Sequence, residues 1–422
     1  MTINHVVILG AGPAGLAAAL ALARSPAPSP RVTVLELRAH PAPALGGTIN
    51  LTPLAMRYLD RLGAGARLRP RGIPVRGIDI LSLRTGRPLG RMWDGVDALR
   101  VLRQELVSAL VETAREAGGV ELRYGVRVIE IEEWGVADGG EDAGGLVLKL
   151  EDGEEIRADM LVGADGIHSV ARRLVVEPER KPEYSGKAAA YGFVQVAEPG
   201  SVAVTRSDGK PAVEDTTVVS GQFGSIMMTF GEPDRRNLHI GAVMGMREQG
   251  ESREGWKARG DDRLQVKSDI LKRFDNGSVR GLVDVVQELE DWTLYPVYVL
   301  PPGGRWSKGR VLLIGDAAHA MPPQGESTGL AIEDGVLLAR VLQRHTSRSV
   351  SQLCDDFFTL RQKTIDKVYK ETLWRWQHAG GEDSGWLWGI VVEWMSMVFL
   401  TLMSYRKEDY FASDVDKMQL PE

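Results

Sequence analysis

The chain has 422 residues, of which 43% are apolar and 26% charged, so it is long enough for two or three domains with ordinary globular cores. Its net charge of -6 argues against nucleic acid as a partner, and its single cysteine, Cys354, excludes an internal disulfide framework and a Cys-rich zinc site. No secretory signal precedes the first apolar run, so we expect a cytoplasmic protein. We also expect no bound metal ion.

The first predicted element is a buried parallel strand, Val6 to Leu9, which leads into a glycine-rich turn. The stretch "VVILGAGPAGLAAALALA" contains the pattern G-x-G-x-x-G, followed by an Ala/Leu-rich helix. This pattern suits a dinucleotide. Gly10 permits a tight turn, Gly12 lets a pyrophosphate approach the backbone, and Gly15 lets the helix pack closely on the strand. The amides of the first helical turn, which begins with Pro13 and Ala14, would face the phosphates.

A second apolar strand, "RVTVLEL", ends at Glu36, 21 residues after Gly15. At this distance an acidic side chain accepts hydrogen bonds from the ribose of a bound dinucleotide. Because a carboxylate repels a 2′-phosphate, the pattern disfavours NADP at this site and leaves FAD and NAD as candidates.

Two further strand ends carry an aspartate beside a glycine. The stretch "LVGADGIHSVARR" places Asp165 and Gly166 after a short apolar strand, with Arg172 on the segment that follows. The stretch "RVLLIGDAAHAMPPQGESTGLAIEDG" places Gly315 and Asp316 after another buried strand, ahead of a proline-containing loop and a helix. An aspartate at such a position is either the cap of an ordinary turn or a ligand-binding group.

With these three motifs in this order, the chain resembles the group A flavoprotein monooxygenases, the p-hydroxybenzoate hydroxylase-like and salicylate hydroxylase-like aromatic hydroxylases. The resemblance implies an α/β fold that has a Rossmann-like FAD-binding domain, an inserted antiparallel-sheet substrate domain and a C-terminal helical segment. It also implies that Asp316 bonds the ribityl chain of FAD and that Arg103 reaches FAD from a helix. The implied FAD-binding residues are Gly10, Gly12, Pro13, Ala14, Gly15, Glu36, Gly47, Arg103, Asp165, Gly166, Gly315, Asp316, Gly325, Ser327, Thr328 and Gly329.

The resemblance implies the reaction as well. In the family, NAD(P)H reduces FAD, and the reduced flavin reacts with O2 to form a C4a-hydroperoxide that hydroxylates an electron-rich small molecule. The expected substrate is phenolic or aromatic, or a lipophilic polyketide or terpenoid of secondary metabolism, and the choice between NADH and NADPH stays open. The sequence has no second G-x-G-x-x-G for a nicotinamide cofactor, which suits a family in which that cosubstrate docks transiently. Two alternatives remain: an epoxidase or reductase of the same superfamily, and a flavin-binding module without turnover.

The candidate catalytic residues are those that could activate a phenol or shape its pocket. They are Tyr191, His239, Tyr295, Tyr298 and Pro322. The two tyrosines at 295 and 298 lie just before the strand of the third motif, a position that approaches the active site in the family. The proline fixes the loop expected over the flavin.

Two features depart from the family. Glu326 stands in the loop before the last helix, where a carboxylate would repel an anionic reduced flavin, so we expect it to point away from the flavin to solvent. The strand "AAYGFVQV" has Tyr191 and Gly192 where relatives often carry an arginine, so no role of that arginine is transferred.

The predicted FAD-binding domain is discontinuous and consists of residues 1–73, 97–182 and 296–370. Residues 74–96 and 183–295 show β-type alternation and form the predicted substrate domain, with one or two surface helices within 248–288. The C-terminal helical region, 371–422, contains the apolar stretch 386–405, which is long enough to cross a bilayer but carries Glu393 near its middle. This stretch has three open interpretations: packing on the protein or on a second subunit of a homodimer, peripheral contact with a membrane, or a membrane span.

Overall fold

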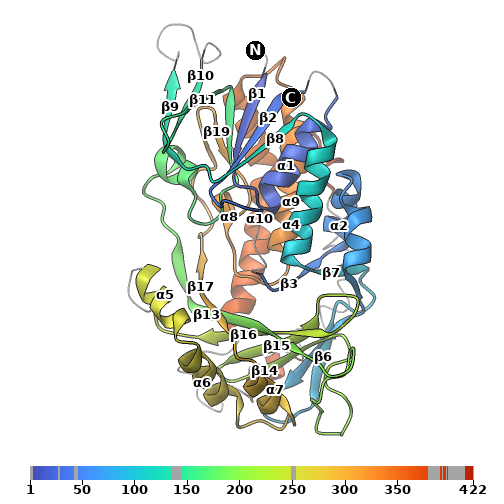
Figure 1. The fold of residues 1–422 in the computed structure, drawn as a ribbon. Helices are drawn as coiled ribbons and strands as arrows, with labels where there is room; N and C mark the ends of the chain where they lie inside the picture. Colours follow the sequence, from blue (N-terminus) through green and yellow to red (C-terminus); the bar gives the residue numbers. More distant parts are fainter. Residues whose placement is uncertain are drawn as a thin grey trace.

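The computed structural model describes residues 3–26, 29–41, 46–134, 144–248, 253–378, 390–391, 393–395, 397 and 414–421. Within them the chain forms two packed parts, each with its own large sheet and its own hydrophobic core (Figure 1). A long helix connects the two parts.

The upper part in Figure 1 is built on a six-stranded sheet. Its strands, in spatial order, are β18 (Ser307–Lys308), β19 (Val311–Leu313), β12 (Met160–Gly163), β1 (His5–Leu9), β2 (Arg31–Glu36) and β8 (Val120–Tyr124). Strand β18 pairs with β19 in the antiparallel sense, and the other neighbours are parallel. Strand β1 is buried along its whole length, as expected for a parallel sheet that is covered on both faces.

Helices cover one face of this sheet. Helices α1 (Pro13–Ala23) and α4 (Arg103–Ala117) contact the sheet, α9 (Ser327–Leu342) packs on α1, and α2 (Pro53–Arg61) packs on α9. A three-stranded sheet made of β9 (Val128–Trp134), β10 (Gly145–Leu150) and β11 (Glu155–Ala158) contacts β1 and β12 and shares the same core. The short elements of this part are α3 (Gly65–Leu68), η1 (Arg69–Arg71), the π-helix η2 (Arg172–Val176) and α8 (Asp316–His319).

The lower part is a seven-stranded sheet. Its order is β17 (Thr293–Val299), β13 (Glu183–Gln195), β16 (Asn237–Gly245), β15 (Gly224–Phe230), β14 (Thr216–Gly221), β5 (Ile78–Ser82) and β6 (Pro88–Met92). Neighbouring strands are antiparallel except for the parallel pair β14 and β5. A small sheet with the order β3 (Thr48–Leu51), β7 (Ala98–Leu102) and β4 (Ile73–Val75) joins this part to the upper one (Figure 1).

Three helices cover the far side of the seven-stranded sheet: α5 (Arg253–Asp261), α6 (Arg263–Phe274) and α7 (Leu282–Glu288). The sequence predicts one or two surface helices here, and that prediction is wrong in number. Val266, Ile270 and Phe274 of α6 lie in the core of this part, because one face of the sheet would otherwise be open to water.

The long helix α10 (Val350–His378) runs from the upper part to the lower sheet (Figure 1). Its early residue Phe357 lies in the upper core, and Trp376 near its end packs with Ala189 and Val297 of the sheet. Lys187 of β13 donates a hydrogen bond to the backbone carbonyl of Trp376 and closes this contact. The helix therefore holds the two parts at a defined spacing.

The predicted α/β fold with a Rossmann-like domain and an inserted, mainly antiparallel sheet is confirmed. Strand β17 crosses the proposed boundary between residues 295 and 296, and the domain limits themselves stay a prediction. Among the described residues, no helix has the length and apolarity needed to cross a bilayer. Most of the apolar stretch 386–405 lies outside the described residues, but Glu393 is described and pairs with Ser82 and Arg84 of the lower part.

Candidate active site

The three predicted strand ends lie side by side. Strands β1, β12 and β19 are neighbours in the sheet and run parallel, so their carboxyl ends share one edge. A β-carbon on Gly10 would lie 2.5 Å from the carbonyl oxygen of Ala164, next to Asp165. A β-carbon on Gly315 would lie 2.9 Å from the β-carbon of Ala14. Turns that are far apart in the sequence are therefore in direct contact.

Each glycine of the first turn has a distinct geometry. Gly10 has a φ of +100°, and a β-carbon on Gly15 would lie 2.0 Å from the carbonyl oxygen of Gly10. Gly12 forms the N-cap of α1, and a β-carbon there would meet nothing within 4 Å. The first and third glycines are thus required by close packing, whereas the second opens onto free space ahead of the helix amides.

The Glu36 carboxylate lies beside this turn at the end of β2. Its Oε2 accepts a hydrogen bond from the Ala11 amide at 2.8 Å, and its Oε1 accepts one from the Arg38 amide at 3.0 Å. These two bonds fix the carboxylate at the sheet edge. Each oxygen keeps a further lone pair for a ligand hydroxyl.

The Asp165–Gly166 turn holds its aspartate beside Gly10. Asp165 Oδ2 accepts from the Val170 amide at 2.6 Å, whereas Oδ1 is buried and meets no hydrogen-bond donor among the described residues. Burial raises the pKa of this carboxyl group. A β-carbon on Gly166, whose φ is +77°, would meet nothing within 4 Å. Arg172 is buried behind the turn and donates to the carbonyl oxygen of Ala317 at 2.7 Å, which joins the second motif to the third.

In the third motif, Gly315 precedes α8 with a φ of 58°, and its amide donates to Asp334 Oδ2 at 2.8 Å. Asp316 follows at the first position of the helix. Its side chain is open to solvent, although the protein around it is dense enough to raise the pKa of its carboxyl group. Asp316 therefore lies in a recess and not on the outer surface.

Arg103 begins α4 and lies between two sets of predicted site residues. The segment Gly46–Gly47 packs on it: a β-carbon on Gly46 would lie 3.0 Å from the β-carbon of Arg103, whose amide donates to the carbonyl oxygen of Gly47 at 3.1 Å. Burial raises the pKa of Asp316, Tyr191 and Tyr295, and the positive charge of Arg103 opposes that rise in all three. The charge of Arg103 therefore acts on the third motif and on the tyrosines at once.

Tyr191, Tyr295 and His239 form one aromatic cluster on the seven-stranded sheet. The Tyr191 ring centre lies 6.1 Å from that of Tyr295 and 5.9 Å from that of His239. His239 is buried, its Nδ1 is hydrogen-bonded to Thr48 Oγ1 at 3.1 Å, and a β-carbon on Gly47 would lie 2.5 Å from its Nε2. Burial, with a smaller effect of Arg100, lowers the pKa of His239 to about 4, so the imidazole is neutral at physiological pH.

Tyr298 lies apart from this cluster. Its hydroxyl donates to Glu248 Oε1 at 3.3 Å, and its ring contacts those of Tyr184 and His168. Because side chains alternate along a strand, Tyr295 and Tyr298 of β17 point to opposite sides. The structure brings three of the four predicted aromatic residues together and separates the fourth.

The loop after α8 borders the same region. Pro322 is buried, Gly325 has a φ of +103°, and a β-carbon on Gly329 would lie 3.3 Å from Thr52 Oγ1. Ser327 and Thr328 open α9 with Gly329.

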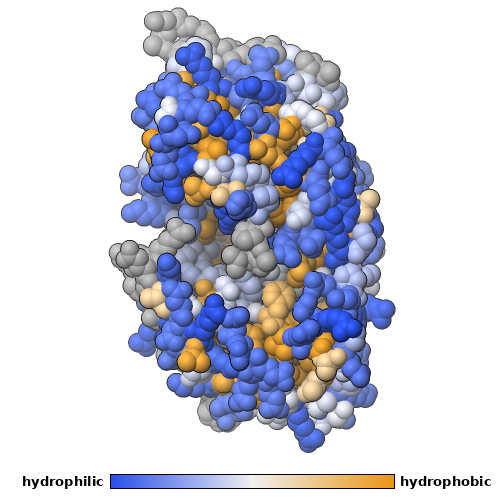
Figure 2. Space-filling view, viewed as in Figure 1, coloured by the Kyte–Doolittle hydropathy of each residue, from blue (hydrophilic) through white to orange (hydrophobic). Residues whose placement is uncertain are grey.

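The expectation that Glu326 points to solvent is wrong. It is 6% exposed, and Arg375 of α10 donates to its Oε1 at 2.6 Å, which offsets its charge. Figure 2 shows a recess in the surface between the upper and lower parts.

Comparison with known proteins agrees with this geometry. Residues 4–372 match a family described as an FAD binding domain. The chain belongs to this FAD-binding family. A salicylate hydroxylase of Pseudomonas putida is 29% identical over 386 residues, which cover 87% of this chain and 84% of the relative. A 6-hydroxynicotinate 3-monooxygenase of Pseudomonas fluorescens is 26% identical over 403 residues, covering 91% of this chain and 94% of the relative.

Solved structures of similar proteins support the same fold. Klebsiella pneumoniae HpxO, solved with FAD and uric acid, has a TM-score of 0.73 at 20% identity, over 96% of this chain and 93% of that one. As a member of the FAD-binding family, this protein binds FAD and is an FAD-dependent monooxygenase. The predicted identity of the family, the cofactor and the class of enzyme is thereby confirmed.

The residues at the sheet edge fit FAD. The space at Gly12 and Gly166 leaves room for a ligand against the backbone, and the amides of α1 face that space. Asp165 Oδ1 is a buried acceptor that meets no donor among the described residues. Asp316, which follows β19, is open to solvent and offers a carboxylate acceptor at the same sheet edge.

Three residues of this region escaped the sequence analysis. Trp93 has a φ of 58°, rare for a bulky side chain, and a β-carbon on Gly325 would lie 3.6 Å from its indole ring. Arg375 neutralises Glu326, and Asp334 holds the Gly315 amide. One local signal could have found Asp334: it follows Glu333 in the middle of α9, where the other residues from Gly329 to Ala339 are apolar and paired acids are costly unless they have partners.

Proposed function

We propose that the protein uses NADH or NADPH and O2 to hydroxylate a small electron-rich aromatic substrate, preferably one with a phenolic hydroxyl. The observation that carries the proposal is that Gly47 contacts both Arg103, whose amide donates to its carbonyl oxygen, and His239 of the aromatic cluster. One O2 is consumed for each NAD(P)H. One oxygen atom enters the substrate, and the other leaves as water.

The proposed FAD contacts follow from the geometry of the three turns. The amides of α1 and the open backbone at Gly12 take the pyrophosphate, Glu36 takes the adenosine ribose, and Asp316 takes the ribityl chain. The amides of Ser327, Thr328 and Gly329 lie at the N-terminus of α9, where they favour negative charge on the reduced cofactor. When bound, FAD supplies the transfer of electrons from the nicotinamide and the activation of O2.

The proposed substrate pocket is lined by the aromatic cluster. Burial raises the pKa of Tyr191 and Tyr295, so both hydroxyls are protonated at neutral pH and can donate a hydrogen bond to a phenolate oxygen. Arg103 adds a positive charge that stabilises a phenolate. His239 is neutral and buried, so we assign it the positioning of Gly47 and Thr48 and not a proton transfer.

The names of the relatives support the substrate class. The Pseudomonas putida relative is a salicylate hydroxylase, and a relative from Streptomyces platensis, 28% identical over 349 residues, is a 3-amino-4-hydroxybenzoate 2-monooxygenase. The substrates in these names are hydroxylated aromatic acids. For this chain we propose a substrate with the shared feature, an aromatic ring that bears a hydroxyl group. The proposal does not require a carboxylate on that ring.

The test is a measurement of NADH and NADPH oxidation together with O2 uptake, using salicylate, 4-hydroxybenzoate and 6-hydroxynicotinate as probes. We expect at least one probe to accelerate both the oxidation of NADH or NADPH and the uptake of O2. Mass spectrometry should then show a product that is heavier than the probe by one oxygen atom. A matched control uses the Asp316→Ala variant, which should lose FAD and with it both reactions. Nicotinamide oxidation that no aromatic probe accelerates would contradict the hydroxylase. Product formation without O2 uptake would favour a reductase.

A further inference from the structure

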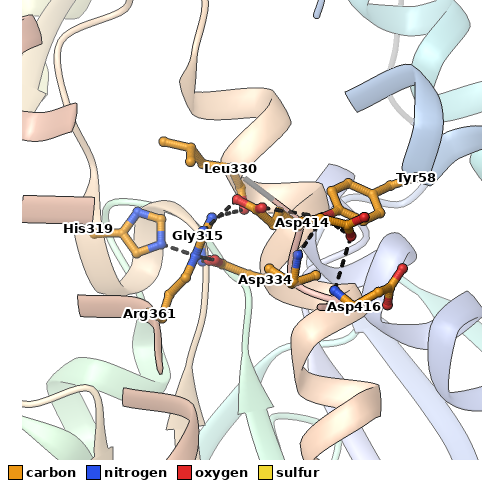
Figure 3. A network of polar contacts seen from close by, with 10 residues as sticks. Tyr58, Gly315, His319, Leu330, Asp334, Arg361, Asp414 and Asp416 are labelled. Carbon is orange, nitrogen blue, oxygen red and sulfur yellow. Dashed lines mark hydrogen bonds and ion pairs between the residues drawn. The ribbon is translucent and has the colours of Figure 1, made fainter. Parts of the chain in front are cut away.

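A buried polar network lies directly behind the third motif (Figure 3). Its centre is Asp334 of α9, which is fully buried. Asp334 Oδ2 accepts from the Gly315 amide at 2.8 Å and from His319 Nε2 at 2.7 Å, and Oδ1 accepts from Arg361 Nε at 2.6 Å. One carboxylate thus binds both ends of the short helix α8, which starts with Asp316.

The charge of this carboxylate is well defined. Burial alone would raise the pKa of Asp334, but His319, Arg361 and the Gly315 amide outweigh burial and lower the pKa to about 2. The neighbouring Glu333, also paired with Arg361, has its pKa raised, chiefly by burial. Asp334 is therefore ionised at neutral pH, which makes its bonds to the turn charge-assisted.

The network continues to the C-terminal segment, which we define as residues 414–416. The hydroxyl of Tyr58 of α2 lies 3.4 Å from both Glu333 Oε1 and Asp414 Oδ1, the two acceptors within reach of its proton among the described residues, and it accepts a hydrogen bond from the Val415 amide at 2.9 Å. Val415 is fully buried in the upper core, and Arg340 of α9 donates to its carbonyl oxygen. Arg361, which donates to both Asp334 and Glu333, connects these two acids. Figure 3 shows His319, Asp334 and Arg361 on one side of this network and Tyr58, Asp414 and Asp416 on the other.

We propose that Asp334 is a positioning residue for FAD binding, and that Tyr58 couples the C-terminal segment to the same task. This inference rests on the proposed role of Asp316 as an FAD ligand. The direction of the Asp316 side chain depends on the turn at Gly315, whose φ of 58° and close approach to Ala14 suit glycine. The Asp334 carboxylate fixes that turn through the Gly315 amide. Tyr58 contacts Glu333, which is paired with Arg361, and so helps to fix the position of Arg361 beside Asp334.

A purely structural role is the competing explanation, and it makes a different prediction. If the network only stabilised the fold, its loss would lower the melting temperature of the apoprotein but leave the FAD affinity of the folded protein unchanged. A positioning role changes the FAD affinity itself, because the folded apoprotein then spends less time in the binding-competent geometry.

The experiment measures the Kd for FAD, by flavin fluorescence quenching on the full-length apoprotein, together with the apoprotein Tm. Asp334→Asn keeps the shape but places an amide donor against Gly315, His319 or Arg361, and we expect its Kd to rise about tenfold or more. Tyr58→Phe removes only the hydroxyl link, and we expect a rise of about threefold to fivefold. Tyr184→Phe is the control, because it loses a comparable hydroxyl bond, to the Met246 carbonyl at 3.0 Å, within the lower sheet.

The outcomes separate this inference from the proposed function. Raised Kd values in Asp334→Asn and Tyr58→Phe, with an unchanged Kd in Tyr184→Phe, support it. Should Asp334→Asn fail to fold, Tyr58→Phe decides alone. Parental Kd values in the folded variants, with only a lower Tm, overturn the inference while leaving FAD binding intact. If Asp316→Ala also binds FAD like the parent, the proposed role of Asp316 fails instead.

Discussion

Gly315 and Ala14 touch where the third motif meets the first. A β-carbon on Gly315 would come within 2.9 Å of the Ala14 β-carbon, closer than two such carbons approach without a shift. The backbone of Gly315, with φ of 58° and ψ of −145°, also lies in a region that other residues rarely adopt. Both constraints act at the residue that directly precedes Asp316.

Gly315→Ala should therefore lose stability and FAD together. We expect the free energy of unfolding to fall by roughly 1–3 kcal/mol, because strain and collision act at one site. Urea denaturation of the apoprotein measures this loss. Gly153→Ala is the matched control: its φ of +90° is equally unfavourable, but the new β-carbon would meet nothing within 4 Å. An equal loss in both variants would show that the contact with Ala14 has no separate cost.

Asp316→Ala should purify largely without yellow colour. The carboxylate is the proposed acceptor for the ribityl hydroxyls, and the loss of a charged hydrogen-bond acceptor costs about 1.5–3 kcal/mol of binding, or about tenfold to a hundredfold in Kd. Visible absorbance of the purified protein and an FAD titration measure this. Asp275→Ala, at the exposed end of α6, is the control. Full flavin occupancy in Asp316→Ala would remove Asp316 from the site.

Tyr191→Phe and Tyr295→Phe should each lower kcat/KM for hydroxylation of the aromatic substrate by about tenfold to a hundredfold, because each variant lacks a hydrogen-bond donor to the phenolate. FAD affinity should stay unchanged, and hydrogen peroxide release should increase as turnover becomes uncoupled from hydroxylation. In Tyr298→Phe, kcat/KM should fall much less, because the hydroxyl of Tyr298 donates to Glu248 outside the cluster. If Tyr298→Phe has the largest effect, the pocket has been assigned to the wrong side of β17.

The stability of the protein should fall on mild acidification through His239. Its pKa is about 4 in the folded protein, below the ordinary histidine value of 6.5 that applies to the unfolded chain. Between these two values the unfolded chain binds a proton that the native protein does not. The free energy of unfolding therefore decreases as the pH falls from 6.5 toward 4, by up to roughly 1.4 kcal/mol per pH unit from this group.

The measurement is urea denaturation of the parent and of His239→Gln at pH 7 and pH 5. Glutamine does not titrate, so the stability advantage of the parent over the variant should be smaller at pH 5. A difference that stays constant between the two pH values would mean that His239 titrates alike in both states.

The local sequence was sufficient to find the cofactor edge. Gly10, Gly12 and Gly15 follow an apolar strand, and the aspartates at 165 and 316 follow two more, so each turn could be recognised within a few residues of chain. Parallel strands that end on such turns meet at one edge of a sheet, and the structure brings β1, β12 and β19 together there.

The substrate side was only partly accessible to the same reasoning. Tyr191 and Tyr295 were candidates, but their contact depends on the pairing of β13 with β17, and the separation of Tyr298 depends on which side of β17 faces the cluster. Strand alternation predicts that two sides exist and does not predict which side is buried. Trp93 carries no local signal at all, because its contact with Gly325 joins segments more than two hundred residues apart.

The sequence by itself determined the family, the FAD-binding turns and the class of chemistry, because glycines and acids at strand ends act through short-range backbone geometry. Tertiary structure alone decided that Glu326 is neutralised by Arg375, and that Asp334, Tyr58 and the C-terminal segment stand behind Asp316. These contacts join residues from separate helices and from the end of the chain. Their pairing is set by packing in three dimensions, for which a linear pattern has no counterpart.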